Sequence, residues 1–251
     1  MFLTYDSLSE ILFLDIETVA LASDFNGLAE NQQNYWTKKA SRFSRNENIS
    51  HQELSELYLA KAGIFAEFSK IICISVGFLT IEDKDIQKLR IKSFFGDNEA
   101  DLLAQFRSLL NEHFNKPRKH FLCGHNLREF DIPFICRRML VHEMELPDLL
   151  KLSGKRPWQI EHLLDTLDLW RFGDFKHYIS LGLLADILGI PSPKDDIDGS
   201  DIHEVYWHQK DIKRIVTYCE KDVVTVAKLL LKLNRIYGKD DFAVESATDI
   251  V

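Results

Sequence analysis

Apolar and polar residues follow two periodicities along this chain, one typical of strands and one typical of helices. Apolar runs rich in Ile, Val and Leu predict strands at residues 11–18, 70–79, 89–95 and 120–124, with a weaker one at 160–164. Apolar residues spaced by three and four, together with capping signals, predict helices at residues 102–114, 133–142, 180–189 and 211–237. Helices therefore begin to alternate with strands only after three consecutive strands.

This order of elements predicts the fold class. Three strands followed by helix, strand, helix, strand and helices favour an α/β protein whose helices cover a mixed sheet, rather than an all-parallel doubly wound fold. Residues 20–69 are too polar for a core and too long for a hairpin, and a capping box from Ser50 to Glu53 indicates a helix within them. We expect a single domain over residues 1–251, with a helical insertion at 20–69 and a short tail at 238–251.

The composition excludes several classes of protein. With 45% hydrophobic and 28% charged residues among 251, the chain can bury a full core and is neither disordered nor collagenous. Its 39 acidic residues exceed its 31 basic ones, so nucleic acid would need a local basic patch or bound metal. The four cysteines lack zinc-ligand and redox-motif spacing. Because we find no membrane-spanning stretch and no signal-peptide pattern, we expect a cytoplasmic location and no membrane partner.

Two acidic residues interrupt the first predicted strand. Asp15 and Glu17 lie two positions apart in the run ILFLDIET, so their side chains share one face of an otherwise apolar strand. Neighbouring carboxylates repel each other and are costly to bury unless a cation lies between them. Oxygen ligands suit Mg²⁺ or Mn²⁺ rather than zinc. The alternative is a strand end where both acids reach solvent without a metal.

Further candidates follow the fourth strand and lie on the last helix. Asp131, in GHNLREFDIPF, stands where a strand gives way to a helix, so it either serves a metal or caps that helix. Tyr218 and Asp222 lie four residues apart in YCEKD and share a helix face. Both are at the flank of the buried stripe, where a side chain reaches either a cleft or solvent.

The three motifs together, DxE, NxxxFD and YxxxD, resemble those of the DEDD superfamily of 3′–5′ exonucleases. They fit the subgroup that carries tyrosine in the third motif, since Thr217 occupies the position of the base in the histidine subgroup. The resemblance is closer still to the exonuclease domain of family-B DNA polymerases, in a stand-alone group of polymerase-related predicted exonucleases. Asn126, Phe130 and Pro133 fit its second motif. The likeness spans about residues 11–230.

This resemblance implies a fold and a mechanism. The fold is ribonuclease H-like, with a five-stranded mixed sheet in which strand two is antiparallel to the rest. The mechanism is two-metal-ion hydrolysis with Mg²⁺ or Mn²⁺, in which Asp15 contacts both ions, Glu17 and Asp222 complete one site and Asp131 serves the other. Tyr218, with a phenol pKa near 10, would orient water by hydrogen bonding rather than act as a base.

Substrate-binding residues are predicted from two sources. The resemblance places Thr18, Asn126 and Phe130 beside the substrate. Within the insertion, residues 31–46 contain four basic residues and no acidic one. Helical spacing gathers a basic and aromatic set on one face: Tyr35, Lys38, Arg42 and Arg45. Such a face suits phosphate contact and base stacking, although it is equally typical of a solvated surface helix.

The sequence therefore predicts a metal-dependent 3′–5′ exonuclease that acts on the free 3′ end of single-stranded nucleic acid, with DNA favoured and DNA repair as its setting. An RNA exonuclease is the alternative among enzymes, because no motif indicates whether the protein contacts a 2′ hydroxyl. A domain that binds nucleic acid or a polymerase without cutting is the alternative from another class. The intact set of site residues argues against it, since a binding domain has no need of clustered acids.

Overall fold

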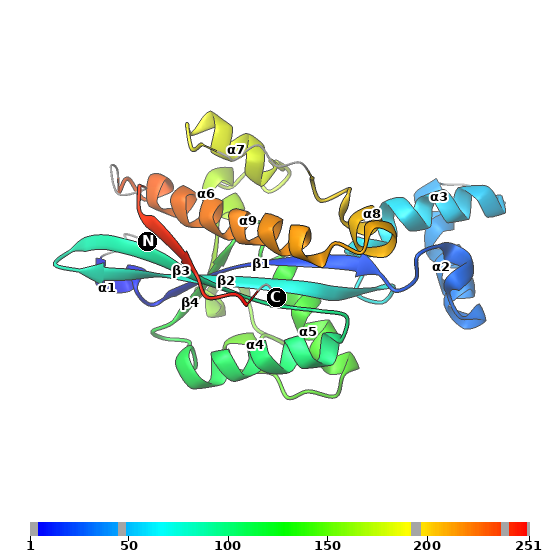
Figure 1. The fold of residues 1–251 in the computed structure, drawn as a ribbon, viewed down its shortest axis with the longest axis horizontal. Helices are drawn as coiled ribbons and strands as arrows, with labels where there is room; N and C mark the ends of the chain where they lie inside the picture. Colours follow the sequence, from blue (N-terminus) through cyan, green and yellow to red (C-terminus); the bar gives the residue numbers. More distant parts are fainter. Residues whose placement is uncertain (1–4, 45–48, 192–196, 237–240, 250–251) are drawn as a thin grey trace.

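The computed structural model describes residues 5–44, 49–191, 197–236 and 241–249, which are built around one mixed sheet (Figure 1). The strands are β1 (Ile11–Ala20), β2 (Ser69–Glu82), β3 (Asp85–Phe95), β4 (Phe121–Gly124), β5 (Leu163–Asp165) and β6 (Ala243–Ser246). They lie in the order β5-β4-β1-β2-β3-β6. Because β2 pairs antiparallel with β1 and β3 while every other pairing is parallel, β2 runs opposite to the other five strands.

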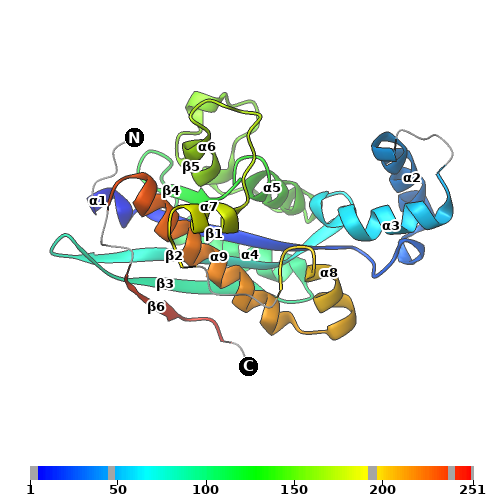
Figure 2. The ribbon, with the colours of Figure 1, turned by 90° about the horizontal axis from the view of Figure 1, so that it is seen from above.

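Helices cover both faces of this sheet (Figures 1 and 2). The α-helices are α1 (Tyr5–Leu8), α2 (Glu30–Ser44), α3 (His51–Lys61), α4 (Glu99–His113), α5 (Asp131–Val141), α6 (Thr166–Arg171), α7 (Leu181–Ile187), α8 (Ile202–Glu204) and α9 (Ile212–Leu233). The long α9 crosses one face of the sheet and contacts α6 and α7, whereas α4 and α5 lie on the other face. One π-helical turn, Val205–Gln209, joins α8 to the segment before α9. Among the described residues, no helix combines the length and apolar character needed to cross a membrane.

Strand β1 lies in the middle of the sheet and is packed on both faces. Leu14 and Ile16 belong to the core under α4 and α5, whereas Phe13 belongs to the core under α9. Successive side chains of a strand point to opposite faces. The same alternation therefore directs Asp15 and Glu17 to one face of β1, as the sequence predicts, and this face is the one covered by α9.

The segment between β1 and β2 forms the predicted helical insertion, with α2 and α3 lying beyond the end of the sheet (Figure 2). It has a small core of its own, in which the buried Trp36 packs edge-on against Tyr58 and Phe68. Ser50 begins α3 with the predicted capping box, since its side chain and that of Glu53 each accept a hydrogen bond from the other residue's backbone. The insertion is therefore stabilised by its own small core beyond the end of the sheet.

Three features differ from the sequence prediction. The sheet has six strands rather than five, because β6 lies in the segment expected to be a tail and pairs parallel with β3. All four residues of β6 are exposed, so they carry no buried apolar pattern by which the strand could be recognised. Strand β5 begins at Leu163 rather than at residue 160. The last helix ends at Leu233, and its predicted extension to residue 237 reaches beyond the described residues.

Candidate active site

A cavity of about 700 Å³ opens beside the middle of β1, bounded by the β4–α5 loop, the start of α7 and α9. Fifteen residues line it: Asp15, Ile16, His125, Asn126, Phe130, Asp131, Tyr178, Ser180, Leu181, Gly182, Ile197, Asp198, Gly199, Tyr218 and Asp222. Four of the five predicted catalytic residues are among them, contributed by segments far apart in the sequence. The remaining one, Glu17, is buried next to Asp15.

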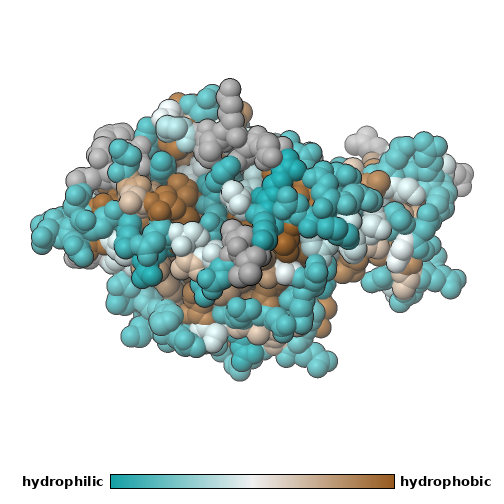
Figure 3. Space-filling view, viewed as in Figure 1, coloured by the Kyte–Doolittle hydropathy of each residue, from teal (hydrophilic) through white to brown (hydrophobic). Residues whose placement is uncertain are grey.

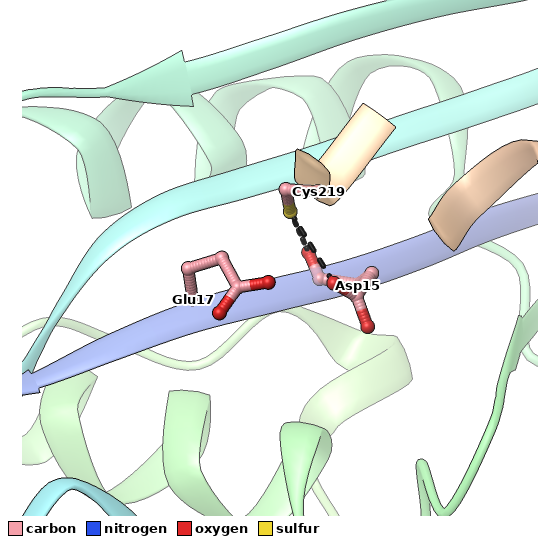
Figure 4. Close-up of side chains that lie close together, drawn as sticks. All are labelled: Asp15, Glu17 and Cys219. Carbon is pink, nitrogen blue, oxygen red and sulfur yellow. Dashed lines mark hydrogen bonds between the residues drawn. The ribbon is translucent and has the colours of Figure 1, made fainter. Parts of the chain in front are cut away.

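Asp15 and Glu17 project from β1 towards α9 (Figure 4). A carboxylate oxygen of each lies within 4.8 Å of the other and of the sulfur of Cys219. The Cys219 thiol donates to the backbone oxygen of Asp15 at 3.5 Å and to its Oδ2 at 3.4 Å. Burial, ahead of every other cause, raises the pKa of this thiol, so it stays protonated and acts as a donor rather than as a thiolate ligand.

The pairing of β1 with β2 is interrupted by a β-bulge between Glu17 and Thr18. In the pairing of β1 with β2, one extra residue, Ile72, lies opposite the Glu17–Thr18 step. Both Ile72 and Cys73 consequently pack in the cluster beneath α9. The hydroxyl of Thr18 donates to the backbone oxygen of Gly63 at 2.8 Å and so ties β1 to the insertion. Thr18 does not line the cavity, and its contact with a substrate stays a prediction.

The loop after β4 delivers Asn126 and Asp131 to the cavity. The carboxylate of Asp165 accepts hydrogen bonds from the backbone N–H groups of Asn126 and Arg128, both at 2.9 Å. Asn126 adopts the left-handed conformation, with φ of 61°, which asparagine tolerates better than most residues. Its Oδ1 is buried and has no hydrogen-bond partner within the described residues. Asp131 follows as the first residue of α5 rather than as its cap, which is Phe130.

Burial and mutual repulsion raise the pKa values of the carboxyl groups in the cavity. Burial, and then the charges of Asp222, Glu17 and Asp131, raise the pKa of Asp15 well above its usual value. Burial is also the main cause that raises the pKa of Glu17, and it raises the pKa of Asp131 to about 7. The described residues that line the cavity include no lysine or arginine. A set of oxygen donors whose described surroundings in the cavity include no lysine or arginine therefore fits a hard divalent cation.

Tyr218 is the non-acidic member of the group. Burial, followed by repulsion from Asp222, raises the pKa of its phenol above the usual value of about 10. A hydrogen bond to the carboxylate of Asp222, one helical turn further on, adds to this shift. Tyr218 is therefore protonated at neutral pH and can act as a hydrogen-bond donor but not as a base.

The raised pKa of Asp131 predicts how the metal-free fold responds to pH. Folding raises this pKa from about 4 to about 7, so the carboxyl's contribution to stability is full below pH 4 and is lost as the pH rises through 7. In EDTA, the difference in Tm, wild type minus Asp131→Asn, should fall between pH 4 and pH 8. The fall should be roughly 2–4 °C for each kcal/mol of unfolding free energy that the carboxyl no longer contributes. Adding Mg²⁺ should reduce the fall, because a cation favours the ionised carboxylate. A difference that is constant or rises with pH would contradict this electrostatic description.

The predicted basic face lies apart from the carboxylate cavity. Tyr35, Lys38 and Arg42 line a separate cavity of about 470 Å³ on α2, whereas Arg45 is outside the described residues. Trp36 and Ala40 are buried on the opposite side of α2. In Figure 3, hydrophilic residues dominate the visible surface of the insertion, at the right of the view. The structure thus places these predicted binding residues on a second surface.

Several residues of the cavity were not predicted from the sequence. Tyr178, Ser180 and Asp198 line it, from the connection before α7 and the segment before α8. His125 holds the first of these segments in place, since its ring nitrogens lie 2.9 Å from the hydroxyl of Thr166 and 2.9 Å from the backbone oxygen of residue 179. The one sequence signal for this wall is the capping Ser180, which marks where α7 begins.

The six-stranded sheet with its antiparallel second strand, together with an acidic cavity at the central strand, has the arrangement of a ribonuclease H-like α/β protein. Residues 64–247 match the family described as predicted 3′–5′ exonuclease related to the exonuclease domain of PolB, and the chain belongs to this family. Asp131, Tyr218 and Asp222 lie within the matched region, whereas Asp15 and Glu17 precede it. A search of curated proteins found no match.

Proposed function

We propose that the protein is a divalent-metal-dependent enzyme that hydrolyses phosphodiester bonds from the 3′ end of single-stranded DNA. One observation carries this proposal. Carboxylates from β1, the start of α5 and α9 converge on one cavity whose described lining holds no lysine or arginine, in a member of a predicted 3′–5′ exonuclease family. A site of this composition repels a phosphodiester until cations are bound, so metal and substrate binding are coupled.

The residues suggest how two ions, Mg²⁺ or Mn²⁺, would be held. The charges of Glu17, Asp131 and Asp222 all raise the pKa of Asp15, so the four carboxylates act on one another. By the motif resemblance, Asp15 would hold both ions, Glu17 and Asp222 would hold one of them, and Asp131 would hold the other. When bound, two such ions supply the positive charge that stabilises the attacking and departing oxygens of the phosphodiester.

Neutral residues of the cavity would position the substrate. Tyr218 is a protonated donor and would orient the attacking water. The unpartnered Oδ1 of Asn126 is an acceptor that a hydroxyl of the terminal nucleotide can satisfy, which would remove the cost of burying it alone. Phe130 offers an apolar wall for the terminal base or sugar.

An assay with labelled oligonucleotides tests this function. Single-stranded DNA and RNA of one sequence, labelled at the 5′ end, would be incubated with Mg²⁺, with Mn²⁺ and with EDTA. We expect successive shortening from the 3′ end with either metal, none with EDTA, and faster shortening of DNA. Faster cleavage of RNA would favour the RNA exonuclease. Tight binding without cleavage under all conditions would favour a non-catalytic binding domain.

The basic face of α2 is proposed to hold the strand several nucleotides away from the cut. Changing Lys38, Arg42 and Arg45 together to Gln should weaken binding of long oligonucleotides, because phosphate contacts are lost. The slope of log affinity against log salt should decrease by up to about 0.7 for each lost contact. Cleavage of a dinucleotide should be nearly unchanged, since it cannot extend from the cavity to α2.

A second triple variant controls for net charge. Lys116, Arg118 and Lys119 lie in the α4–β4 connection and line neither the carboxylate cavity nor the basic cavity on α2. Changing them to Gln removes the same charge and should leave affinity and salt slope close to those of the wild type. Equal effects of both triple variants would mean that only overall charge matters, and no effect of either would leave α2 an ordinary solvated helix.

A further inference from the structure

Three aromatic side chains protrude from the connection between α6 and α7. Phe172 is 89% exposed, Phe175 79% and Tyr178 64%, and none of them belongs to a core cluster of the described residues. Large apolar side chains that lie close together in the sequence and all face water indicate a candidate interaction site. Packing within the chain does not account for these three residues.

The backbone beneath these rings is firmly anchored. Arg171 is buried, and its guanidinium donates to the backbone oxygen of His177 at 2.8 Å and to the carboxylates of Glu129 and Asp168 at 3.1 and 3.2 Å. Phe172 adopts the left-handed conformation, with φ of 46°, which is unusual for a bulky residue. The exposed rings are thus presented by a fixed connection, which lowers the entropic cost of binding something on them.

The connection that carries the aromatic residues reaches the carboxylate cavity at Tyr178. Tyr178 is part of the cavity wall together with Ser180 and Leu181. Phe175 and Phe172 precede Tyr178 by three and six residues along the same anchored connection. A strand whose 3′ end lies among the carboxylates and that leaves the cavity past Tyr178 would run along this connection.

We propose that Phe172, Phe175 and Tyr178 form a stacking surface for the unpaired bases that precede the 3′ end of a single strand. This inference rests on the proposed exonuclease function. Every base offers a flat π-face, so aromatic rings bind single strands of any sequence, whereas a duplex keeps these faces inside its own stack. The connection carries one lysine, Lys176, and one aspartate, Asp174, so the rings rather than charge supply the affinity. The surface would make the enzyme selective for single strands.

Steady-state kinetics of the double variant Phe172→Ala/Phe175→Ala test the proposal, with Tyr178 left in place because it lines the cavity. On a ten-nucleotide oligothymidylate we expect KM to rise at least about tenfold, with kcat changed less than about twofold. The p-nitrophenyl ester of thymidine 5′-monophosphate holds one nucleotide and should be cleaved as by the wild type. Oligonucleotides that lack bases upstream of the 3′ end should raise KM for the wild type but not for the variant.

Two matched variants distinguish stacking from general apolar contact. Leu183→Ala/Ile187→Ala removes two aliphatic side chains, each 53% exposed, from the neighbouring α7 and should leave KM unchanged. Phe172→Trp/Phe175→Trp keeps rings and should retain the wild-type KM. An unchanged KM in the alanine variant, or an equal rise in the α7 variant, would overturn the proposal, the latter indicating a docking site for protein. A parallel loss on the single-nucleotide ester would instead mean that the connection only supports the cavity.

Failure of the proposed function would give a different result. If the wild type cleaved neither substrate, binding of a fluorescent oligothymidylate in EDTA would still be measured by anisotropy. Weaker binding by Phe172→Ala/Phe175→Ala than by the wild type would then support the stacking surface on a protein that does not cut. Equal binding by both would reject it.

Discussion

Asp15→Asn and Asp222→Asn are each expected to abolish hydrolysis while leaving the metal-free fold at least as stable as the wild type. Loss of one carboxylate removes a ligand from the cation site, and removing even one electrostatic contact to a reacting group costs about 10²–10³ in rate. Stability should not fall, because the charge of Asp222 is one of the causes that raise the pKa of Asp15. Removing either charge relieves that repulsion.

The check combines hydrolysis of a labelled oligonucleotide with melting curves in EDTA. Asp83→Asn serves as the control, because Asp83 is exposed in the β2–β3 turn with φ of 50°, a conformation that asparagine also tolerates. It should retain full activity. Full activity in Asp15→Asn or Asp222→Asn would refute the metal assignment. A marked fall of their Tm in EDTA would show that the carboxylates stabilise the fold rather than strain it.

We propose that two surfaces hold the strand: the basic face of α2 and the aromatic connection before α7. The two surfaces differ in how their affinity for the strand depends on salt. Contacts between basic side chains and phosphates release counterions, so their loss changes the salt dependence of binding. Contacts between rings and bases release none, so the loss of Phe172 and Phe175 should lower affinity by a similar factor at all salt concentrations. Comparing the two sets of variants across a salt series therefore separates the two contributions on one substrate.

The parts of the fold that the sequence predicts are those in which a regular pattern is repeated several times. Strand β1 alternates sides over ten residues, which places Asp15 and Glu17 together on the α9 face. Strand β6 has four residues, all exposed, and β5 is only three residues long, so neither repeats a pattern often enough to be located. The sequence therefore does not predict the sixth strand, and it predicts a start for β5 that is three residues too early.

Most of the candidate site can be predicted because motif residues lie at the ends or on the faces of such regular elements. What could not be predicted depends on contacts between distant segments. Asp165 shapes the loop that carries Asn126 through hydrogen bonds across 39 residues of sequence. The Thr18 hydroxyl bonds to the insertion beside a bulge in β2, and no residue of β1 indicates that the bulge is there. The path of the α6–α7 connection, which brings Tyr178 to the cavity, likewise depends on His125 and Arg171.

Tyr218→Phe is expected to lower kcat by about 10²–10⁴ while metal affinity stays close to that of the wild type. The substitution keeps the ring and removes only the hydroxyl, which is protonated because burial and the charge of Asp222 raise its pKa. Water in the site then loses the donor that orients it. The metal ligands keep their carboxylates, so the midpoint of a Mn²⁺ titration of activity should move less than about twofold.

Tyr206→Phe is the matched control for this prediction. Its hydroxyl also donates to an aspartate, Asp97 at 2.6 Å, but Tyr206 does not line the carboxylate cavity. It should therefore retain activity within about twofold, even if losing the hydrogen bond costs about 1 kcal/mol of stability. A collapse of metal binding in Tyr218→Phe would show that its hydroxyl serves to hold Asp222 in place. Tyr206 lies outside the cavity lining, so its hydroxyl is not placed to act on water there. An equal loss of kcat in both variants would therefore indicate a general effect of removing a hydroxyl, and would argue against a role of Tyr218 in orienting water.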